Sequence, residues 1–164
     1  MQRNLGCTGH VNLARIKGFD EERVRGEIRA YINNLRQNYT LTAYCGCADG
    51  ADLLFAEEFL KCGVQLVAVL PCPPEEFTLE HSDGGLEFMR VLESAKEILI
   101  SPDRENRYVG VSNTIVECCD ELLALWDGVE TPLKNAQGED INLGGTYDTV
   151  CRAKSANKKV TLFK

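Results

Sequence analysis

Three glycine-containing segments carry the side chains in this sequence that are best suited to hold an anionic ligand. The first reads "GCTGHVN", where Gly6 and Gly9 flank Thr8, and His10 follows, directly after a strand-like run. Glycines let a backbone approach a ligand closely, and the Thr8 hydroxyl can donate a hydrogen bond. This segment by itself is weak evidence for a ligand site, because glycine is also common in the turns that follow strands.

The second segment reads "CGCADGADLLFAEEF" and leads from a strand-like end into a helical pattern. Gly46 and Gly50 bracket a tight turn. Asp49 is a predicted N-cap, and Asp52 falls in the first helical turn, where the macrodipole favours a carboxylate. A structural role therefore explains both aspartates. Alternatively, the glycines and free N–H groups cradle a phosphate or ribose, with one carboxylate accepting from sugar hydroxyls. The residues alone leave both interpretations open.

The third segment reads "LLALWDGVETPLKNAQGEDINLGGTYDTV". The chain leaves a predicted strand at Asp127 and Gly128 and returns at Gly144 and Gly145. With Thr146, these two glycines form a helix start with exposed N–H groups and a hydroxyl donor, which is how proteins hold anions. A plain turn with Thr146 as N-cap is the structural alternative. Three such loops exceed what turns require, so we predict a phosphate-bearing ligand.

Short apolar runs alternate with segments of helical period, which is typical of an α/β domain. The predicted strands are Asn4–Cys7, Leu41–Cys45, Val64–Leu70, Glu97–Ile100, Glu121–Trp126 and Lys159–Leu162. The predicted helices are Asp20–Asn38, Asp49–Cys62, Gly84–Ser94, Tyr108–Cys118 and Thr146–Ala156. We expect residues 1–164 to form one Rossmann-like, doubly wound α/β domain, whose mostly parallel sheet of about six strands has helices on both faces. Ligands bind at the carboxyl ends of strands in such sheets, where the three loops lie.

Composition limits the partners and the location that we expect. The chain has 164 residues and a formal net charge of −7, which repels nucleic acid and anionic membranes. We therefore expect neither nucleic acid nor a membrane as a partner. No apolar run is long enough to cross a bilayer, so the sequence indicates a cytoplasmic protein.

The sequence holds eight cysteines, and we predict free thiols because a reducing cytosol is the better assumption. Most lie in or near strand and helix ends, where cysteine behaves as a small hydrophobic residue. A metal site from Cys7, His10, Cys45 and Cys47 is the alternative, but no paired CxxC supports it. We predict neither a metal nor a cofactor.

Four stretches together resemble the SLOG superfamily of Rossmann-like domains, which includes the LOG nucleotide phosphoribohydrolases and the DNA-processing protein DprA. They are "TGH", "GCADGADLLFAEEFLKCGVQLVAVLP", "ENRYVGVSNTIVECCDELLALWDG" and "GGTYDTV", in this order over nearly the whole chain. The resemblance implies a sensing or binding module for a nucleotide or a nucleotide-derived, ADP-ribose-like molecule. The residues it implies as binders are Gly6, Thr8, Gly9, Gly46, Asp49, Gly50, Asp52, Gly144, Gly145 and Thr146.

The sequence departs from the motif of LOG enzymes that cleave N-glycosidic bonds. That motif is PGGxGTxxE, whereas this chain has "LGGTYDTV". Thr149 stands at the glutamate's offset from Thr146, and Asp148 lies one residue short, which turns it about 100° away on a helix. The alternative function, hydrolysis of nucleoside 5′-monophosphates, would therefore use Asp148 or Asp52 as the catalytic carboxylate, with Asp49 as a further option.

Basic residues that could complement a phosphate are few. The segment "SPDRENRYVG" brings Arg104, Asn106 and Arg107 to a predicted helix start. Arg90, Arg104 and Arg107 are also the candidates for the paired arginine of LOG enzymes.

Two further expectations concern a flap and assembly. The segment "LPCPPEEFTLEHSDGG" is either a stiff connector or, as we favour, a flap over the site. We expect His81 within this segment to be a solvated loop residue. A role in acid–base catalysis is the less favoured alternative. The helix Tyr108–Cys118 holds more apolar surface than one sheet face covers, in Val109, Val111, Ile115 and Val116. We therefore expect a homo-oligomer.

Overall fold

A computed structural model describes residues 1–102, 106–130, 133–134, 137, 140–141 and 145–164. Its main sheet has six strands, all paired in parallel, in the order β4-β3-β2-β1-β5-β8. They are β1 (Gln2–Gly9), β2 (Thr40–Cys45), β3 (Gln65–Leu70), β4 (Glu97–Ile100), β5 (Glu121–Leu125) and β8 (Lys159–Phe163). The predicted α/β fold with six parallel strands is confirmed. β1 is longer than predicted, so Thr8 and Gly9 belong to the strand and pair with Ala124 and Leu125.

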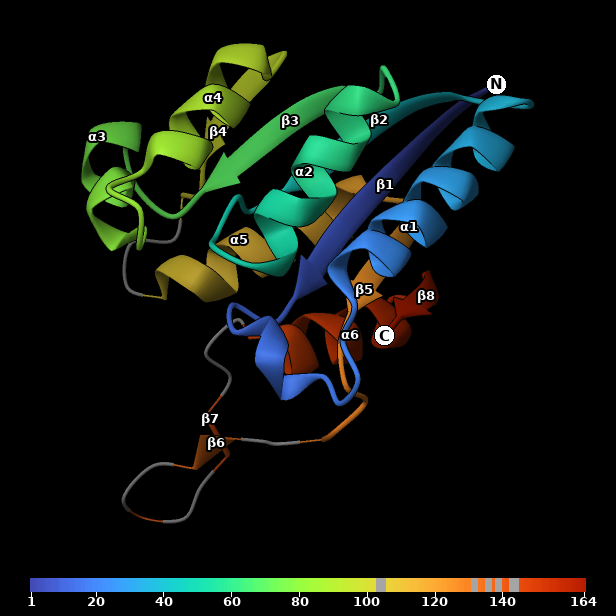
Figure 1. The fold of residues 1–164 in the computed structure, drawn as a ribbon. Helices are drawn as coiled ribbons and strands as arrows, with labels where there is room; N and C mark the ends of the chain where they lie inside the picture. The colour runs from blue at the N-terminus through green and yellow to red at the C-terminus, as the bar shows by residue number, and fades with distance from the viewer. Residues whose placement is uncertain (103–105, 131–132, 135–136, 138–139, 142–144) are drawn as a thin grey trace.

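Helices cover both faces of this sheet (Figure 1). One face carries α1 (Glu21–Arg36), α2 (Ala51–Lys61) and α4 (Leu86–Ser94), and the other carries α5 (Arg107–Cys118) and α6 (Thr146–Ser155). Shorter elements are η1 (Leu13–Arg15), α3 (Pro74–Phe77), η2 (Thr78–Glu80) and the antiparallel pair β6 (Leu133–Lys134) and β7 (Asp140–Ile141). The pair β6–β7 lies apart from the sheet in Figure 1.

The helices form where the sequence supplies a cap and an apolar stripe. In α1 the Asp20 side chain accepts from Arg23 N at 2.9 Å, and Val24, Ile28 and Ile32 are buried at a spacing of four. α2 is buried on several sides because it packs against α1, α4 and the sheet.

The winding places a crevice beside the central strand. From β1 the chain proceeds through β2 and β3 to the β4 edge, and then returns along α5 to β5, on the other side of β1. The direction of winding therefore reverses between β1 and β5. Ligands in doubly wound sheets bind outside the carboxyl ends of the strands at such a switch point.

The prediction that Asp49 is an N-cap is wrong, and the alternative with Thr146 as N-cap is not what the structure shows. α2 begins at Ala51 with Gly50 as its cap, and the Asp49 carboxylate instead accepts from Ser82 N at 2.8 Å. Gly50 is required there because its φ is 77° and an added Cβ would collide with the Val11 carbonyl oxygen. At α6 the cap is Gly145, so Thr146 is the first helical residue.

All eight cysteines are free thiols. Cys7, Cys45 and Cys47 gather in the core on one face of the sheet. Within the described ranges, however, no cluster of three or more possible ligands could hold a metal ion, so the alternative metal site finds no support. Among the same residues, no helix has the length and apolar character needed to span a bilayer.

Candidate functional site

A cavity of about 490 Å³ opens at the switch point, a volume in the range of small-molecule sites. Its walls come from the end of β1 and the segment after it, the starts of α2, α5 and α6, and the end of β5. Of the predicted site residues, eight line it: Thr8, Gly9, His10, Gly46, Asp52, Gly145, Thr146 and Asp148. The predicted residues outside its wall are Gly6, Asp49, Gly50, Asn106, Asp127 and Gly128. Arg104 and Gly144 lie outside the described residues.

Two predicted glycines in β1 serve packing. A Cβ on Gly6 would lie 2.7 Å from Ile115 Cγ2, so the absence of a side chain there lets α5 approach the sheet. A Cβ on Gly9 would overlap the Ala51 side chain and the Leu125 backbone. Gly9 therefore allows the start of α2 to press against the end of β1, and Ala51 N donates to the His10 carbonyl at 3.0 Å.

Asp52 is the carboxyl group in the cavity wall that burial affects most. Burial and the negative charge on Cys45 raise its pKa well above the usual value, against a weak 3.4 Å hydrogen bond from Ala48 N. Burial alone would also raise the pKa of Cys45, but hydrogen bonds from Cys47 and Cys7 lower it well below the ordinary thiol value. Asp52 therefore holds its proton more tightly than an ordinary aspartate, and in its protonated form it can donate a hydrogen bond into the cavity.

His10 and Asp127 meet at the switch point. His10 Nε2 lies 3.1 Å from Asp127 Oδ1, although the two atoms do not complete a well-aligned hydrogen bond. Asp127 Oδ1 also accepts from Val129 N at 2.9 Å, and this bond, followed by His10, lowers the pKa of Asp127. Asp127 is not among the residues that line the cavity, but it lies beside His10, which does line it.

The arginines near the cavity differ in what they already bind. Arg15, in η1, lines the wall and forms neither a hydrogen bond nor an ion pair with any residue that the structure describes. Arg107 is paired with Glu76 at 3.1 Å and with Glu80 at 2.6 Å. Arg15 is therefore the available cation, and sequence reasoning missed it, although it follows the first glycine loop directly.

Asp148 is committed within its own helix. Its Oδ2 accepts from Arg152 Nε at 2.8 Å, and Arg152 also donates to Asn113 Oδ1 at 2.8 Å. Thr149, at the position of the LOG glutamate, is 2% exposed, and its hydroxyl bonds to Ser112 Oγ at 2.8 Å. Asp148, a candidate catalytic carboxylate, is thus paired with Arg152, and Thr149 joins α6 to α5 through Ser112.

The N-terminus of α6 faces the cavity without a side-chain cap. A Cβ added to Gly145 would meet no atom of any residue that the structure describes within 4 Å. A helix start of this kind attracts an anion through its N–H groups and its dipole.

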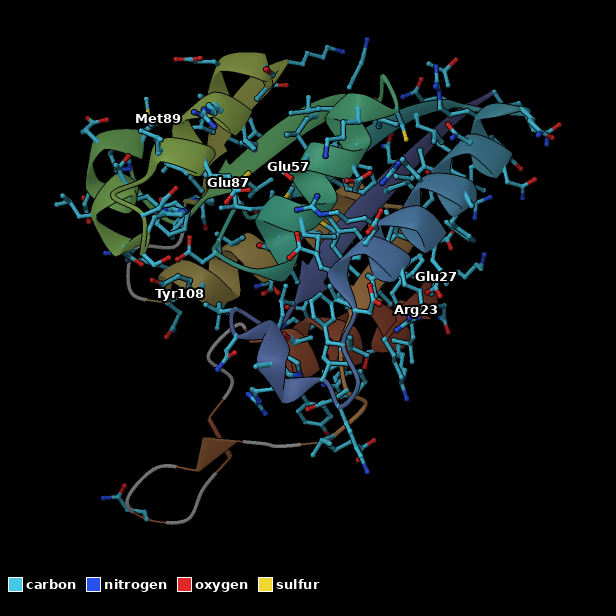
Figure 2. All side chains as sticks on the ribbon, in the orientation of Figure 1. Arg23, Glu27, Glu57, Glu87, Met89 and Tyr108 are labelled. Atoms are coloured by element: carbon cyan, nitrogen blue, oxygen red, sulfur yellow. The ribbon has the colours of Figure 1, made fainter. Side chains whose placement is uncertain are left out.

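Aromatic side chains line the rest of the wall, and sequence reasoning missed them. Trp126 and Tyr147 lie with ring centroids 6.2 Å apart, tilted by 35°. Phe77 and Tyr108 contribute from α3 and α5, and Figure 2 shows Tyr108 at the start of α5. Burial and a hydrogen bond to Glu80 raise the pKa of Tyr108 to about 12. These rings offer flat apolar surface to a ligand.

The proline-rich segment is a wall of the cavity, through Pro71 and Phe77. The prediction that His81 is solvated is wrong, because its ring is 7% exposed and stacks on Phe88 at 4.3 Å. His81 Nδ1 lies 2.9 Å from the Phe77 carbonyl oxygen and Nε2 lies 2.9 Å from that of Cys47. His81 therefore holds the segment in place and does not line the cavity.

Three of the four apolar residues of α5 that led us to expect a homo-oligomer are buried within the chain. Val111, Ile115 and Val116 are buried against the chain's own sheet and α6. Assembly stays a prediction.

Several solved structures have a fold similar to that of this chain. DprA from Streptococcus pneumoniae has a TM-score of 0.65 and 14% identity, over 98% of this chain and 50% of that one. DprA from Helicobacter pylori, described for its single-stranded DNA binding mode, has a TM-score of 0.60 and 13% identity, over 98% and 64%. The molybdenum cofactor carrier protein from Chlamydomonas reinhardtii has a TM-score of 0.54 and 16% identity, over 99% and 76%. The sequence matches no protein-family model and no curated protein.

The comparison contradicts the prediction that nucleic acid is not a partner. The DprA from Helicobacter pylori binds single-stranded DNA with the same fold. The prediction fails because a net charge of −7 describes the whole surface, whereas nucleic acid contacts one local patch.

The chain spans half of the pneumococcal DprA and 64% of the Helicobacter protein, and these identities establish the fold alone. The six-stranded parallel sheet, its winding and these likenesses agree. The chain therefore has the same Rossmann-like α/β fold as these solved structures.

Proposed function

We propose that the protein binds a nucleotide or nucleotide-derived, ADP-ribose-like small molecule in the switch-point cavity and acts as a sensing or binding module. One observation carries the proposal. The unpaired Arg15, the uncapped start of α6 and a wall of aromatic rings all face the same 490 Å³ cavity. A nucleotide combines an anion with a flat ring, and the wall offers a group for each.

Arg15 and the start of α6 would hold the phosphate. A guanidinium binds phosphate oxygens through two parallel hydrogen bonds, and a helix N-terminus adds backbone donors. Two further arginines close to the cavity are already paired, Arg107 with Glu76 and Glu80, and Arg152 with Asp148. Arg15 is exposed at the cavity wall, where its guanidinium is accessible to an anionic ligand in a chain with a net charge of −7.

The sugar and the base would occupy the remaining walls. Thr8, which is 8% exposed, and Asp52, whose pKa is raised by burial, offer hydroxyl and carboxyl groups to sugar hydroxyls. Trp126, Tyr147 and Tyr108 offer ring faces, on which a nucleobase stacks favourably.

A thermal-shift panel with AMP, ADP-ribose and a single-stranded oligonucleotide tests the proposal. A ligand that binds only the folded state stabilises it by mass action and so raises Tm. At a ligand concentration of about a hundred times Kd, the free energy of unfolding rises by about 2.7 kcal/mol. We expect the two nucleotides to raise Tm, and Arg15→Gln to weaken binding at least about tenfold. Arg90→Gln is the matched control, because Arg90 is an exposed arginine outside the cavity wall.

The outcomes separate the ligand classes. No shift with millimolar nucleotide would remove the nucleotide proposal. A shift with the oligonucleotide alone would instead favour a DNA-binding role, as in the Helicobacter DprA. Gly145→Asp places a carboxylate at the start of α6 and is expected to abolish the nucleotide shift.

A further inference from the structure

Three cysteines form a group of buried thiols beside the cavity. Cys7 lies in β1, Cys45 is the last residue of β2, and Cys47 follows in the next turn, and all three side chains are 0% exposed. Cys47 N donates to Cys45 Sγ at 3.3 Å, and the thiols of Cys7 and Cys47 also hydrogen-bond to that sulfur. Cys45 Sγ is therefore the atom that the other two cysteines share.

Cys7 and Cys45 stand next to each other on paired strands. The parallel register of β1 and β2 joins Gly6 to Tyr44, so the next position along each strand is a cysteine. Both cysteines belong to the same core cluster. Neighbouring strands lie about 4.8 Å apart, which is within the Cα–Cα range of about 4.4–6.8 Å that a disulfide requires. The register therefore allows a bond between these two sulfurs with little movement of either strand.

The cavity gives a small oxidant a route to this group. Cys7 lines the cavity, and so does Gly46, which separates Cys45 from Cys47. Asp52 is also in the wall, and its backbone oxygen lies 3.3 Å from Cys45 Sγ. Buried cysteines are ordinarily inert, so closeness to an open cavity is what makes this group a candidate for modification.

We propose that Cys45 and Cys7 form a reversible disulfide when hydrogen peroxide enters the cavity, and that this disulfide weakens ligand binding there. The first half of this inference is independent of the ligand. The second half rests on the proposed nucleotide-binding function.

Cys45 is the sulfur that reacts first. Burial raises its pKa, but hydrogen bonds from Cys47 and Cys7 outweigh burial and lower the pKa well below the ordinary thiol value. The pKa of Cys7 is instead raised, by burial and by its hydrogen bond to Cys45. The thiolate is the nucleophilic form of cysteine, so Cys45 attacks the peroxide and Cys7 follows.

The two steps balance with hydrogen peroxide as the oxidant. The Cys45 sulfur attacks a peroxide oxygen, the O–O bond breaks, and the departing hydroxide takes up the proton that Cys45 has given up and leaves as water. Cys45 is then a sulfenic acid. The Cys7 sulfur attacks the Cys45 sulfur, the S–O bond breaks, and hydroxide leaves with the Cys7 proton as a second water. Each sulfur loses one electron, and the peroxide oxygens gain both.

The disulfide changes the cavity wall beside Asp52. In the reduced protein Cys45 Sγ accepts from Cys47 N and so holds the turn that contains Gly46. A disulfide sulfur carries no charge and is a weak acceptor, so the turn loses this support. A Cβ on Gly46 would lie 2.8 Å from Asp52 Oδ2, which shows how closely the turn and this carboxyl group pack. Movement of the turn therefore displaces a group that we assign to ligand binding.

Peptide mass mapping of the full chain tests the covalent step. The reduced protein is treated with hydrogen peroxide and denatured, and its free thiols are alkylated before digestion. We expect a peptide pair cross-linked through Cys7 and Cys45 that dithiothreitol separates. Its absence while the half-buried Cys151 is oxidised would overturn the proposal, because the peroxide was then active. A link between Cys45 and Cys47 would contradict the partner that we assign.

Two variants test the order of the steps, and the wild-type map decides alone if they do not fold. Cys7→Ser removes the second thiol, so we expect Cys45 to gain oxygen in place of a disulfide. Cys45→Ser should abolish both products. An unmodified Cys45 in the first variant would contradict its role as the reacting sulfur. Cys62→Ser is the matched control with unchanged disulfide yield, since Cys62 is buried at the end of α2, outside the described cavity wall.

Titration of AMP into the reduced and the oxidised chain tests the regulation. We expect oxidation to weaken AMP binding about fivefold or more, and dithiothreitol to restore it. A disulfide that leaves the affinity unchanged overturns the regulation and leaves the modification site standing. Absence of nucleotide binding by the reduced protein overturns the proposed function, whereas the mass map still decides on the disulfide.

Discussion

Glu121 and Asp52 lie at opposite ends of the parallel sheet, and the pKa values of their carboxyl groups are shifted in opposite directions. Glu121 begins β5 and is 0% exposed. It binds Arg3 at 2.7 Å, Tyr31 at 2.5 Å, Thr161 at 2.6 Å and Lys159 at 2.9 Å. Although burial opposes ionisation, these partners lower the pKa of Glu121.

Asp52 has no such set of partners. Among the residues that the structure describes, its side chain accepts one hydrogen bond, from Ala48 N, which is long at 3.4 Å, and burial beside Cys45 raises its pKa. The amino end of the sheet thus uses its buried carboxylate to hold strands and helices together. The carboxyl end has a carboxyl group of raised pKa in the wall of a cavity, which is the arrangement expected where a ligand supplies the missing contacts.

The largest effect that we expect is on folding, from Glu121→Ala. Removal of this carboxylate leaves the charges of Arg3 and Lys159 partly buried without their partner, so stability should fall by about 3–5 kcal/mol. Urea denaturation followed by circular dichroism measures this change. A loss under about 1 kcal/mol would break the comparison, because Glu121 would then matter no more than a surface pair.

Asp52→Asn should change stability little and binding strongly. An amide resembles a protonated carboxyl group in shape and polarity, and the raised pKa of Asp52 favours its protonated form, so we expect the free energy of unfolding to change by less than about 1 kcal/mol. Nucleotide affinity should fall about tenfold, which corresponds to about 1.4 kcal/mol. Titration calorimetry and denaturation on the same sample check both halves. Severe destabilisation with unchanged affinity would reverse the roles that we assign to the two ends.

A carboxyl pair between α2 and α4 provides an intermediate case. Glu57 and Glu87 share a hydrogen bond, which with burial raises the pKa of Glu87 to about 7 from 4.5, and Figure 2 labels both. The folded state holds this proton more tightly than the unfolded chain. Its contribution is therefore complete below pH 4.5 and is lost as the pH rises through about 7.

The change should be under about 1 kcal/mol, because both side chains are partly exposed and solvent screens them. Urea midpoints of the wild type and of Glu87→Gln, each measured at about pH 5 and about pH 8, test this expectation. The difference between the midpoints at the two pH values should be smaller in Glu87→Gln than in the wild type. Equal pH dependence in wild type and variant would contradict the shared proton.

The smallest effect should come from Glu27→Gln on the surface of α1. Glu27 pairs with Arg23 at 2.7 Å, but both side chains are almost half exposed, at 47% and 46% (Figure 2). We expect a change of about 0.5 kcal/mol or less, reduced further by salt. This variant sets the baseline against which Glu121 is judged, and a larger loss would question that baseline.

The sequence predicts the fold well because local patterns determine it. Buried strands such as β3 and β5 appear as continuous apolar runs, and α1 shows its buried stripe at a spacing of four. Strand ends follow from these runs, so Thr8, His10 and Asp52 are placed near one cavity by the parallel order alone.

The sequence predicts the roles of individual site residues less well, because tertiary contacts decide them. Asp49 has the chemistry of an N-cap, yet the close approach of the Val11 carbonyl requires glycine as the cap. Arg15 and Arg107 look alike in the sequence, and only Glu76 and Glu80, from another segment, distinguish them. The aromatic wall combines residues from separate elements, which no local spacing reveals.

The pairing of β1 with β5 has a consequence for the order of folding. Asn4 contacts Asp120 across a separation of 116 residues, whereas β1 to β4 pair through successive neighbours in the chain. Contacts between distant segments close larger loops, so we expect β1–β5 pairing to form late. Because the cavity lies at this junction, a chain arrested before β5 docks would already have helices and strands but no binding site. Affinity for a ligand would then report that folding is complete.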